Sequence, residues 1–256
     1  MIGCIIQARI GSLRLPGKVL MKTDEGKPLL FYVIKQLQYS KKFEKIIVAT
    51  TTNREDDVIE ECVKALGVEY FRGNEKDVLD RYYQCAKKFS LSVIIRITAD
   101  CPLIDPNIAD QVIEKFFSGN FDYATNTLTR TFPDGTDVEV FSFDVLEKAW
   151  KNSVLPSERE HVTPFMRNKK NNFKLYNLES IMNLRDIRIT VDRKQDYELV
   201  KKIISKVKKR PILLNDVLEL LKNEPSLNEI NQDITPNEGM IKSLQDDETF
   251  LKNRET

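Results

Sequence analysis

Short apolar runs alternate with amphipathic stretches along the first half of the chain. The runs have the length of buried strands, and we expect strands at residues 2–8, 45–51, 68–71, 92–98 and 122–126. The intervening stretches carry apolar residues three and four positions apart. They predict helices over residues 29–38, 54–66, 76–89 and 106–117. Such an alternation predicts an α/β fold with a mostly parallel sheet that helices cover on both faces.

The second half is less regular. Its pattern predicts strands over residues 137–141, 173–177 and 186–191, and helices over 144–151, 158–167, 194–208 and 213–222. Beyond Pro225 the chain is polar, and residues 237–252 form either a last, weakly packed helix or a tail. We therefore expect a domain over residues 1–222, followed by a C-terminal extension over 223–256.

Composition narrows the classes of partner. The 256 residues include 40 basic and 39 acidic side chains, for a net charge of +1, which argues against a general nucleic-acid or membrane-surface binder. The four cysteines have no zinc-site spacing, and four free thiols indicate a reducing compartment. No signal peptide or membrane-length apolar run is evident, so we expect a cytoplasmic protein.

The strongest local feature runs from Gln7 to Lys18, directly after the first expected strand. It combines two glycines, a serine and three cations. Glycines let the backbone approach a bulky anion, and successive N–H groups form an anion-binding concavity. Arg9, Arg14 and Lys18 together suit a triphosphate. This is not a Walker A loop, since Val19 follows the lysine. The alternative is an exposed turn with solvated arginines.

This loop resembles the signature of the cytidylyltransferase superfamily, which includes the enzymes that activate 3-deoxy-manno-octulosonate and acylneuraminates. The matching residues are Ile6-Gln7-Ala8-Arg9 and Ser12-Leu13-Arg14-Leu15-Pro16-Gly17-Lys18. The closer resemblance is to the spore-coat polysaccharide biosynthesis branch. It is carried by ATTTNREDDVIEE (49–61), FRGNEKDVLDRYY (71–83), RITADCPLIDP (96–106), PDGTDVEVFSFDVLEKAW (133–150), PSEREHVTPF (156–165) and ITVDRKQDYELV (189–200).

The resemblance implies a three-layer α/β/α sandwich of the nucleotide-diphospho-sugar transferase (glycosyltransferase-A-like) type. It also implies a magnesium-dependent enzyme that couples CTP to a sugar, with a sugar acid as the favoured class, and releases pyrophosphate. The implied catalytic residues are Arg9, Arg14, Lys18 and Asp100. The implied nucleotide-binding residues are Gln7, Ala8, Arg9, Gly11, Ser12, Arg14, Lys18, Arg72, Asp77 and Thr98.

Two aspartates are the candidate Mg²⁺ ligands. Asp100 and Asp192 each follow an expected strand, and Mg²⁺ is commonly held by one or two carboxylates together with phosphate oxygens. The resemblance assigns both to metal binding, although Ala99 stands where the family has glycine and Asp192 lies in VDRKQD rather than VDTPED. The alternatives are a turn or cap at Asp100 and a helix N-cap at Asp192.

Four residues are candidates for contact with the sugar. Asp137 and Glu139 fall on one face of an expected strand, where they can accept hydrogen bonds from sugar hydroxyls, or form a solvated face. Arg159 and His161 lie in a motif of the spore-coat branch, and the alternative for His161, the only histidine, is packing or surface exposure.

Two other functions remain open at this stage. A glycosyltransferase of the same fold would use a nucleotide-sugar donor, but such enzymes normally carry a DxD motif and lack the Arg–Pro–Gly–Lys loop. A non-catalytic nucleotide-binding protein would bind CTP without turnover. Relatives often form dimers through the second half of the chain, so the resemblance also implies a homodimer, with the apolar stretch DVEVFSF (137–143) as a candidate contact.

Overall fold

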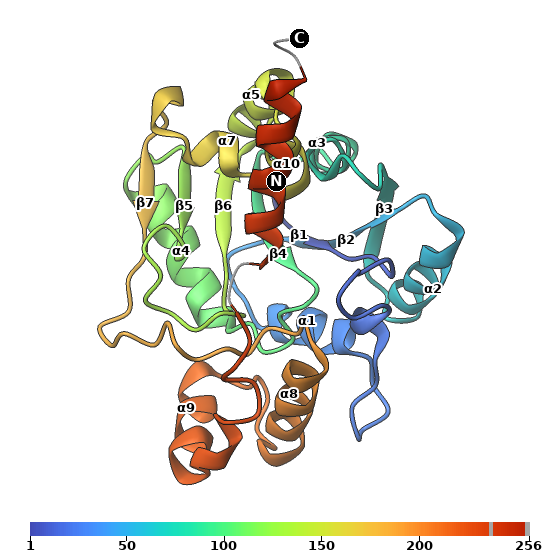
Figure 1. Ribbon diagram of the computed structural model, residues 1–256, viewed down its shortest axis with the longest axis vertical. Helices are drawn as coiled ribbons and strands as arrows, with labels where there is room; N and C mark the ends of the chain where they lie inside the picture. Colours follow the sequence, from blue (N-terminus) through green and yellow to red (C-terminus); the bar gives the residue numbers. More distant parts are fainter. Residues whose placement is uncertain (236–237, 254–256) are drawn as a thin grey trace.

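A seven-stranded sheet in the order β3–β2–β1–β4–β6–β5–β7 forms the centre of the computed structural model, which describes residues 1–235 and 238–253 (Figure 1). Its parallel part consists of β1 (Ile2–Gln7), β2 (Lys45–Thr51), β3 (Glu69–Gly73) and β4 (Val93–Thr98). β6 (Glu139–Ser142) is antiparallel to both β4 and β5 (Tyr123–Thr125), and β7 (Leu175–Asn177) is parallel to β5. The predicted mostly parallel sheet is confirmed.

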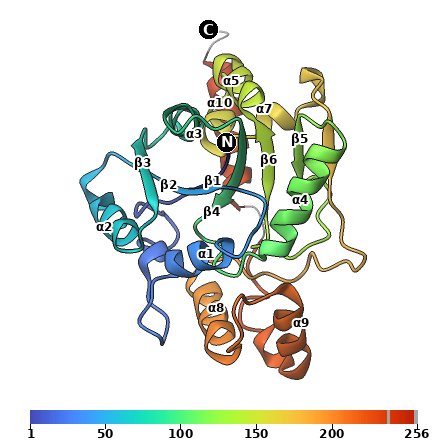
Figure 2. The same ribbon diagram turned by 180° about the vertical axis from the view of Figure 1, so that it is seen from behind.

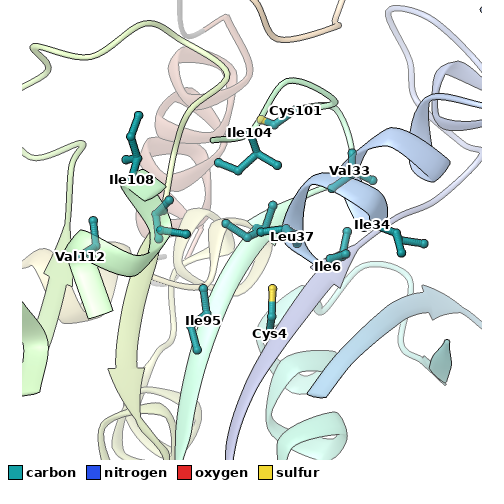
Figure 3. Close-up of a cluster of buried hydrophobic side chains, with 14 of the residues drawn as sticks. Cys4, Ile6, Val33, Ile34, Leu37, Ile95, Cys101, Ile104, Ile108 and Val112 are labelled. Carbon is teal, nitrogen blue, oxygen red and sulfur yellow. The ribbon is translucent and has the colours of Figure 1, made fainter. Parts of the chain in front are cut away.

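Helices cover both faces of this sheet because successive strand residues point to opposite sides. Cys4 and Ile6 of β1 face a core formed with α1 (Leu29–Leu37), α2 (Asp57–Ala65) and α4 (Pro106–Ser118), which Figure 3 shows in part. Ile5 faces the opposite core, formed with α3 (Val78–Lys88), α5 (Phe143–Asn152) and α7 (Pro164–Arg167). Figure 2 shows α1 and α4 in front of the sheet. The three-layer architecture is therefore confirmed.

The C-terminal third adds two further units. α8 (Lys194–Lys206) and α9 (Leu214–Asn223) share a third apolar core with Leu29 and Tyr32 at one end of the sheet. α10 (Glu238–Lys252) lies against α6 (Pro156–His161), across the front of the molecule in Figure 1. Short 3₁₀ helices lie at Lys18–Leu20, Arg54–Asp56, Lys169–Asn171 and Pro225–Leu227.

Two expectations about the second half are wrong. The single helix expected over 158–167 is divided into α6 and α7, because Val162 has a φ of 71° and Pro164 begins α7. The strand expected over 186–191 is an extended segment with only one bridge, between Arg188 and Asp134. Its other backbone bonds go to loops, as in Val191 N to the Asp100 carbonyl at 2.8 Å. This segment therefore fixes a loop against the sheet instead of extending it.

The stretch considered for a dimer contact lies inside the sheet. β6 pairs with β4 on one side and β5 on the other, and Val138, Val140 and Phe141 are fully buried. Of the apolar residues of DVEVFSF, only Phe143 at the start of α5 is partly exposed, so the stretch offers little apolar surface to a second chain. The oligomeric state itself stays a prediction. Among residues 1–235 and 238–253, no helix is long and apolar enough to cross a bilayer. The cytoplasmic location also stays a prediction.

Gly135 is required by the approach of the 186–191 segment. It has a φ of +110°, and a Cβ at this position would lie 2.5 Å from the backbone nitrogen of Thr190. We expect Gly135→Ala to lower the free energy of unfolding by more than the roughly 1–3 kcal/mol of backbone strain alone, because backbone atoms must also move. Thermal unfolding measures this effect.

Gly26→Ala is the matched control, because Gly26 has a φ of +70° with no atom within 4 Å of a Cβ. Both variants introduce the unfavourable φ, but only Gly135→Ala introduces the clash. Equal losses of melting temperature in the two variants would contradict the role given to Gly135.

Candidate active site

The candidate site lies at the carboxyl ends of β1 and β4. Gln7 and Thr98 are register partners at the ends of these neighbouring strands. Because parallel strands end at the same edge of a sheet, the loops that follow them meet there. The structure thus brings the loop after Gln7 next to Asp100, as the sequence predicts.

The loop between Ala8 and Lys18 is held by backbone contacts and one buried carboxylate. Asp56, which is fully buried, accepts hydrogen bonds from the backbone N–H of Ile10 at 2.7 Å and from the hydroxyl of Thr51. The N–H of Gly17 bonds to the carbonyl of Ile10 at 3.0 Å, and its φ of 70° turns the chain toward Lys18. These hydrogen bonds therefore fix the conformation of the loop, which is not a loose surface turn.

Lys18 joins the two candidate metal ligands. Its Nζ lies 2.8 Å from both Asp100 Oδ2 and Asp192 Oδ1, and Arg14 Nη2 lies 2.6 Å from the same Asp192 oxygen. Burial opposes the charge on the Asp192 carboxylate, but Lys18 and Arg14 outweigh it and hold the pKa of Asp192 well below its usual range. Burial likewise opposes the charge on Lys18, and the two aspartates raise its pKa. Lys18 and Asp192 are thus both charged at neutral pH.

Asp192 does not cap α8. The N–H groups of Asp192 and Arg193 donate instead to Asp196, both at 2.9 Å. Arg188 holds the region together, with Nη2 3.2 Å from Asp192 and Nε 2.9 Å from Asp196. The side chain of Asp192 is left to face Lys18, which excludes the N-cap interpretation.

The two carboxylates suit a magnesium ion that also binds substrate phosphates. Asp100 and Asp192 converge on one cationic group, Lys18, so both present oxygens to the same region. Within the described part of the chain, no set of three or more histidine, cysteine or acidic residues forms a cation site. Two carboxylates are nevertheless the usual protein share of a Mg²⁺ site that is completed by phosphate oxygens and water.

The first cavity, of about 340 Å³, lies above the loop. Three of the six lysines and arginines that line it are paired, Lys18 and Arg14 with aspartates and Arg96 with Glu139. Arg9 and Lys242 have no ion-pair partner within residues 1–235 and 238–253. Its walls include Gln7, Ala8, Arg9, Ser12, Arg14, Lys18, Arg81, Thr98, Asp100, His161, Asp192, Gly239, Lys242, Ser243 and Asp246.

Arg81 is the most unusual group in this cavity. It comes from α3, is 1% exposed, and its Nε and Nη1 have no hydrogen-bond partner in the described part of the chain. Burial lowers the pKa of Arg81, and repulsion by Arg9 adds to that effect. A buried cation without a partner is costly, so its place beside Arg9 indicates a site for an anion.

The second cavity, of about 600 Å³, adjoins the first and shares with it Arg14, Arg96, Thr98, Asp100, His161, Asp192 and Gly239. It is lined by alternating acids and arginines. Arg130 binds Asp137 through both guanidinium nitrogens at 2.7 Å, and Arg188 lies 2.6 Å from Asp134. Burial and the neighbouring Asp137 raise the pKa of Asp134 to about 6. These groups offer hydrogen-bond donors and acceptors to a polyhydroxylated ligand.

Glu139 anchors the floor of the second cavity. It is 3% exposed and accepts hydrogen bonds from Tyr123 at 2.5 Å and Thr163 at 2.7 Å. It also pairs with Arg96 and with Arg167, the latter at 3.0 Å. Burial alone would raise its pKa, but the two arginines and the hydrogen bonds lower the pKa of Glu139 to about 2. The expected alternative of a solvated strand face does not hold for this residue.

Four of the expected site residues line neither cavity, namely Gly11, Arg72, Asp77 and Arg159. Arg72 donates to the carbonyls of Thr51 and Asn53 and pairs with Asp57 and Glu60. This placement differs from the expected nucleotide contact, because the guanidinium of Arg72 forms hydrogen bonds and ion pairs within the protein at the end of β2. Gly11 belongs to the loop but does not itself line a cavity.

Asp77 and Arg159 hold α3, α5 and α6 together. Asp77 caps α3 by accepting from the N–H of Asp80 at 2.8 Å. Arg159 donates to the carbonyls of Trp150 and Ser153, both at 2.8 Å, and lies 3.4 Å from Asp77. This differs from the expected substrate contacts, since the polar groups of both residues are used within the protein.

His161 lines both cavities, and its Nε2 lies 2.8 Å from the hydroxyl of Ser243. Burial lowers the pKa of His161. Cys101 borders the second cavity, where burial and Asp100 raise the pKa of its thiol far above the usual range. A protonated, buried thiol suits packing and not nucleophilic catalysis.

Several residues of the site have no function that the sequence alone indicates. Arg81 lies in a matched motif, but its burial depends on the packing of α3. Asp134, Arg96, Arg167 and Arg188 are brought in by contacts between distant segments. Lys242 belongs to the extension, for which no role was inferred. Only the position of Arg96 in the fourth strand, where its neighbours are apolar, signals a buried partner.

Comparisons with known proteins agree on one family. The model of the family described as cytidylyltransferase matches residues 3–235. The chain is 40% identical over 232 residues to an uncharacterized protein of Methanocaldococcus jannaschii, which covers 90% of this chain and 94% of that protein. It is 35% identical over 229 residues to the spore coat polysaccharide biosynthesis protein SpsF of Bacillus subtilis, with 86% and 94% covered. A solved cytidylyltransferase from Leptospira borgpetersenii has a TM-score of 0.86 and 36% identity, over 91% of this chain and 98% of that one.

Proposed function

Because this chain belongs to the cytidylyltransferase family, we propose that it transfers the cytidylyl group of CTP to a sugar hydroxyl and releases pyrophosphate. The main support for the proposal is the position of Lys18. Its Nζ lies 2.8 Å from a carboxylate oxygen of both Asp100 and Asp192, and these two aspartates line both cavities. Such a cluster of fixed charges suits phosphoryl transfer, which depends on positioning and charge stabilisation.

The first cavity is the proposed nucleotide site. Arg9 of the loop and the buried Arg81 both line it, and Nε and Nη1 of Arg81 have no hydrogen-bond partner in the described part of the chain. A triphosphate would supply the anionic oxygens that these guanidinium groups lack, and a planar guanidinium can bind two phosphate oxygens at once. Choice of CTP over other nucleotides rests on the family.

The second cavity is the proposed sugar site. It shares Asp100, Asp192 and Arg14 with the first, so a sugar bound there adjoins the α-phosphate of a nucleotide bound in the first. Attack by the sugar hydroxyl on the α-phosphorus forms the new P–O bond as the bond to the pyrophosphate breaks, and the hydroxyl proton passes to solvent. No covalent enzyme intermediate is formed. Arg14 and Lys18 then face the charge on the leaving group.

Mg²⁺ is the proposed cofactor, held by Asp100 and Asp192. When bound, it would neutralise phosphate charge and lower the pKa of the incoming hydroxyl.

A sugar acid is the favoured substrate class. Arg130 and Arg167 line the second cavity and are half-buried, and either guanidinium can pair with a substrate carboxylate. Arg159 and Arg185 do not line this cavity.

Pyrophosphate release tests the proposal. The protein, with Mg²⁺, is offered each of the four ribonucleoside triphosphates against a panel of sugar acids, neutral sugars and sugar phosphates. We expect release only with CTP and only with one sugar class. Release of a nucleotide from a nucleotide-sugar, with no pyrophosphate from CTP, would replace this proposal by a glycosyltransferase. Binding of CTP without turnover across the panel would favour a binding protein.

A further inference from the structure

The helix α10 forms one wall of the proposed nucleotide site. Gly239, Lys242, Ser243 and Asp246 line the first cavity opposite the loop. They recur at intervals of three and four, so they share one face of the helix. The family match ends at residue 235, three positions before α10 begins. The wall is therefore an addition to the part of the chain that defines the family.

Buried polar contacts hold this wall in place. Asp247, which is 6% exposed, accepts from the backbone N–H of Ser157 at 2.9 Å and from its hydroxyl at 2.5 Å. Ser243 contacts His161 at 2.8 Å, and Glu238 at the start of the helix pairs with Arg193 at 2.6 Å. Contacts at three successive turns fix both the position and the rotation of the helix.

Gly239 is the point at which α10 lies close to Arg14 of the loop. A Cβ at this position would lie 3.3 Å from Arg14 Nη1, which is tighter than ordinary contact. The helix therefore closes directly over the arginine that pairs with Asp192. Lys242, less than one turn further on, is an exposed residue that lines the same cavity as the unpaired Arg9 and Arg81.

We propose that α10 completes the nucleotide site and that Lys242 binds the β- and γ-phosphates of the bound triphosphate. Within residues 1–235 and 238–253, the first cavity holds three cations without a carboxylate partner, Arg9, Arg81 and Lys242. Two come from the family core and one from α10. A triphosphate with its multiple negative charges pairs with all three, whereas a monophosphate does not reach beyond the core cations. This inference rests on the proposed function.

Binding of CTP, pyrophosphate and CMP to the full-length protein tests it, by calorimetry with Mg²⁺ present. We expect Lys242→Ala to weaken CTP and pyrophosphate binding about three- to tenfold, as for the loss of one charge-assisted contact, and to leave CMP binding unchanged. Lys242→Arg should restore most of the affinity. The matched control is Lys252→Ala, since Lys252 lies on the same helix but borders neither cavity.

The outcomes separate this inference from the proposed function. Equal CTP affinity in Lys242→Ala and the unaltered protein would overturn the role of Lys242 while leaving the cytidylyltransferase proposal in place. Equal weakening of CMP and CTP would overturn the assignment to the outer phosphates. An unaltered protein that binds none of the four nucleoside triphosphates would overturn both proposals. An equal loss of CTP affinity in Lys252→Ala would show a general effect of the charge on α10 and would contradict a specific contact between Lys242 and the phosphates.

Discussion

Asp100→Asn should reduce kcat by at least about a hundredfold, with the fold retained. The change removes one of the two carboxylates that face Lys18, and with it the negative charge proposed to hold Mg²⁺. Loss of one group that stabilises developing charge typically costs about 10²–10³ in rate. The size of the side chain is preserved, and the backbone carbonyl of Asp100, which accepts from Val191, is unaffected. The measurement is pyrophosphate release under saturating CTP and sugar, together with the thermal unfolding curve.

Asp144→Asn is the matched control, because Asp144 is exposed on α5 and borders neither cavity. It removes the same charge without touching the site and should leave kcat unchanged. Near-normal turnover in Asp100→Asn would contradict the proposed role of this carboxylate. A large loss of melting temperature would instead mean that the ion pair with Lys18 is chiefly structural.

Glu139→Gln should lower the free energy of unfolding by about 3–5 kcal/mol, as expected when one partner of a buried ion pair is removed. Arg96 and Arg167 would both remain in the protein without their carboxylate. For a chain of this size, the loss corresponds to a fall in melting temperature of roughly 10 °C. Calorimetry or circular dichroism at neutral pH measures it. The control Glu147→Gln changes a carboxylate at the surface and should leave the melting temperature close to its original value.

The ion pairs of Glu139 with Arg96 and Arg167 also predict that the free energy of unfolding depends on pH in the acidic range. The pKa of Glu139 is lowered to about 2 in the folded protein, so its contribution to stability is fully present above its ordinary pKa. That contribution is lost as the pH falls through the window from about 5 to about 2. The unaltered protein should therefore lose stability more steeply across this window than Glu139→Gln does. Parallel slopes in the two proteins would contradict the lowered pKa.

The sequence predicts those parts of the site whose residues lie close together along the chain. The segment from Gln7 to Lys18 is recognisable because its glycines and cations are contiguous, and Asp100 and Asp192 because each follows an apolar run. The alternating apolar runs also predict the parallel sheet, since buried parallel strands require them. The resemblance to the cytidylyltransferase family, drawn from these motifs, is confirmed by the family match.

Other features depend on partners that a linear pattern does not show. The unpaired state of Arg81 follows from the way α3 packs under the loop. The segment 186–191 has the apolar alternation of a strand, but its backbone pairs with turns around Asp134 and Asp100. The position of α10 is hidden for a further reason. Its inward residues are Ser243 and Asp247, so hydrophobic periodicity gives no sign of a buried face.

The shared ammonium of Lys18 also has a consequence for synthesis of the protein. Asp100 and Asp192 follow Lys18 by 82 and 174 positions. At about 5–20 residues per second, the ribosome needs roughly 10–35 s to add Asp192 after Lys18 has been incorporated. A nascent chain in that interval can build the parallel strands, but its basic loop lacks the second of the two carboxylates that neutralise it. Charge balance at this edge of the sheet is therefore achieved only after Asp192 has been added, long after the loop itself has been synthesised.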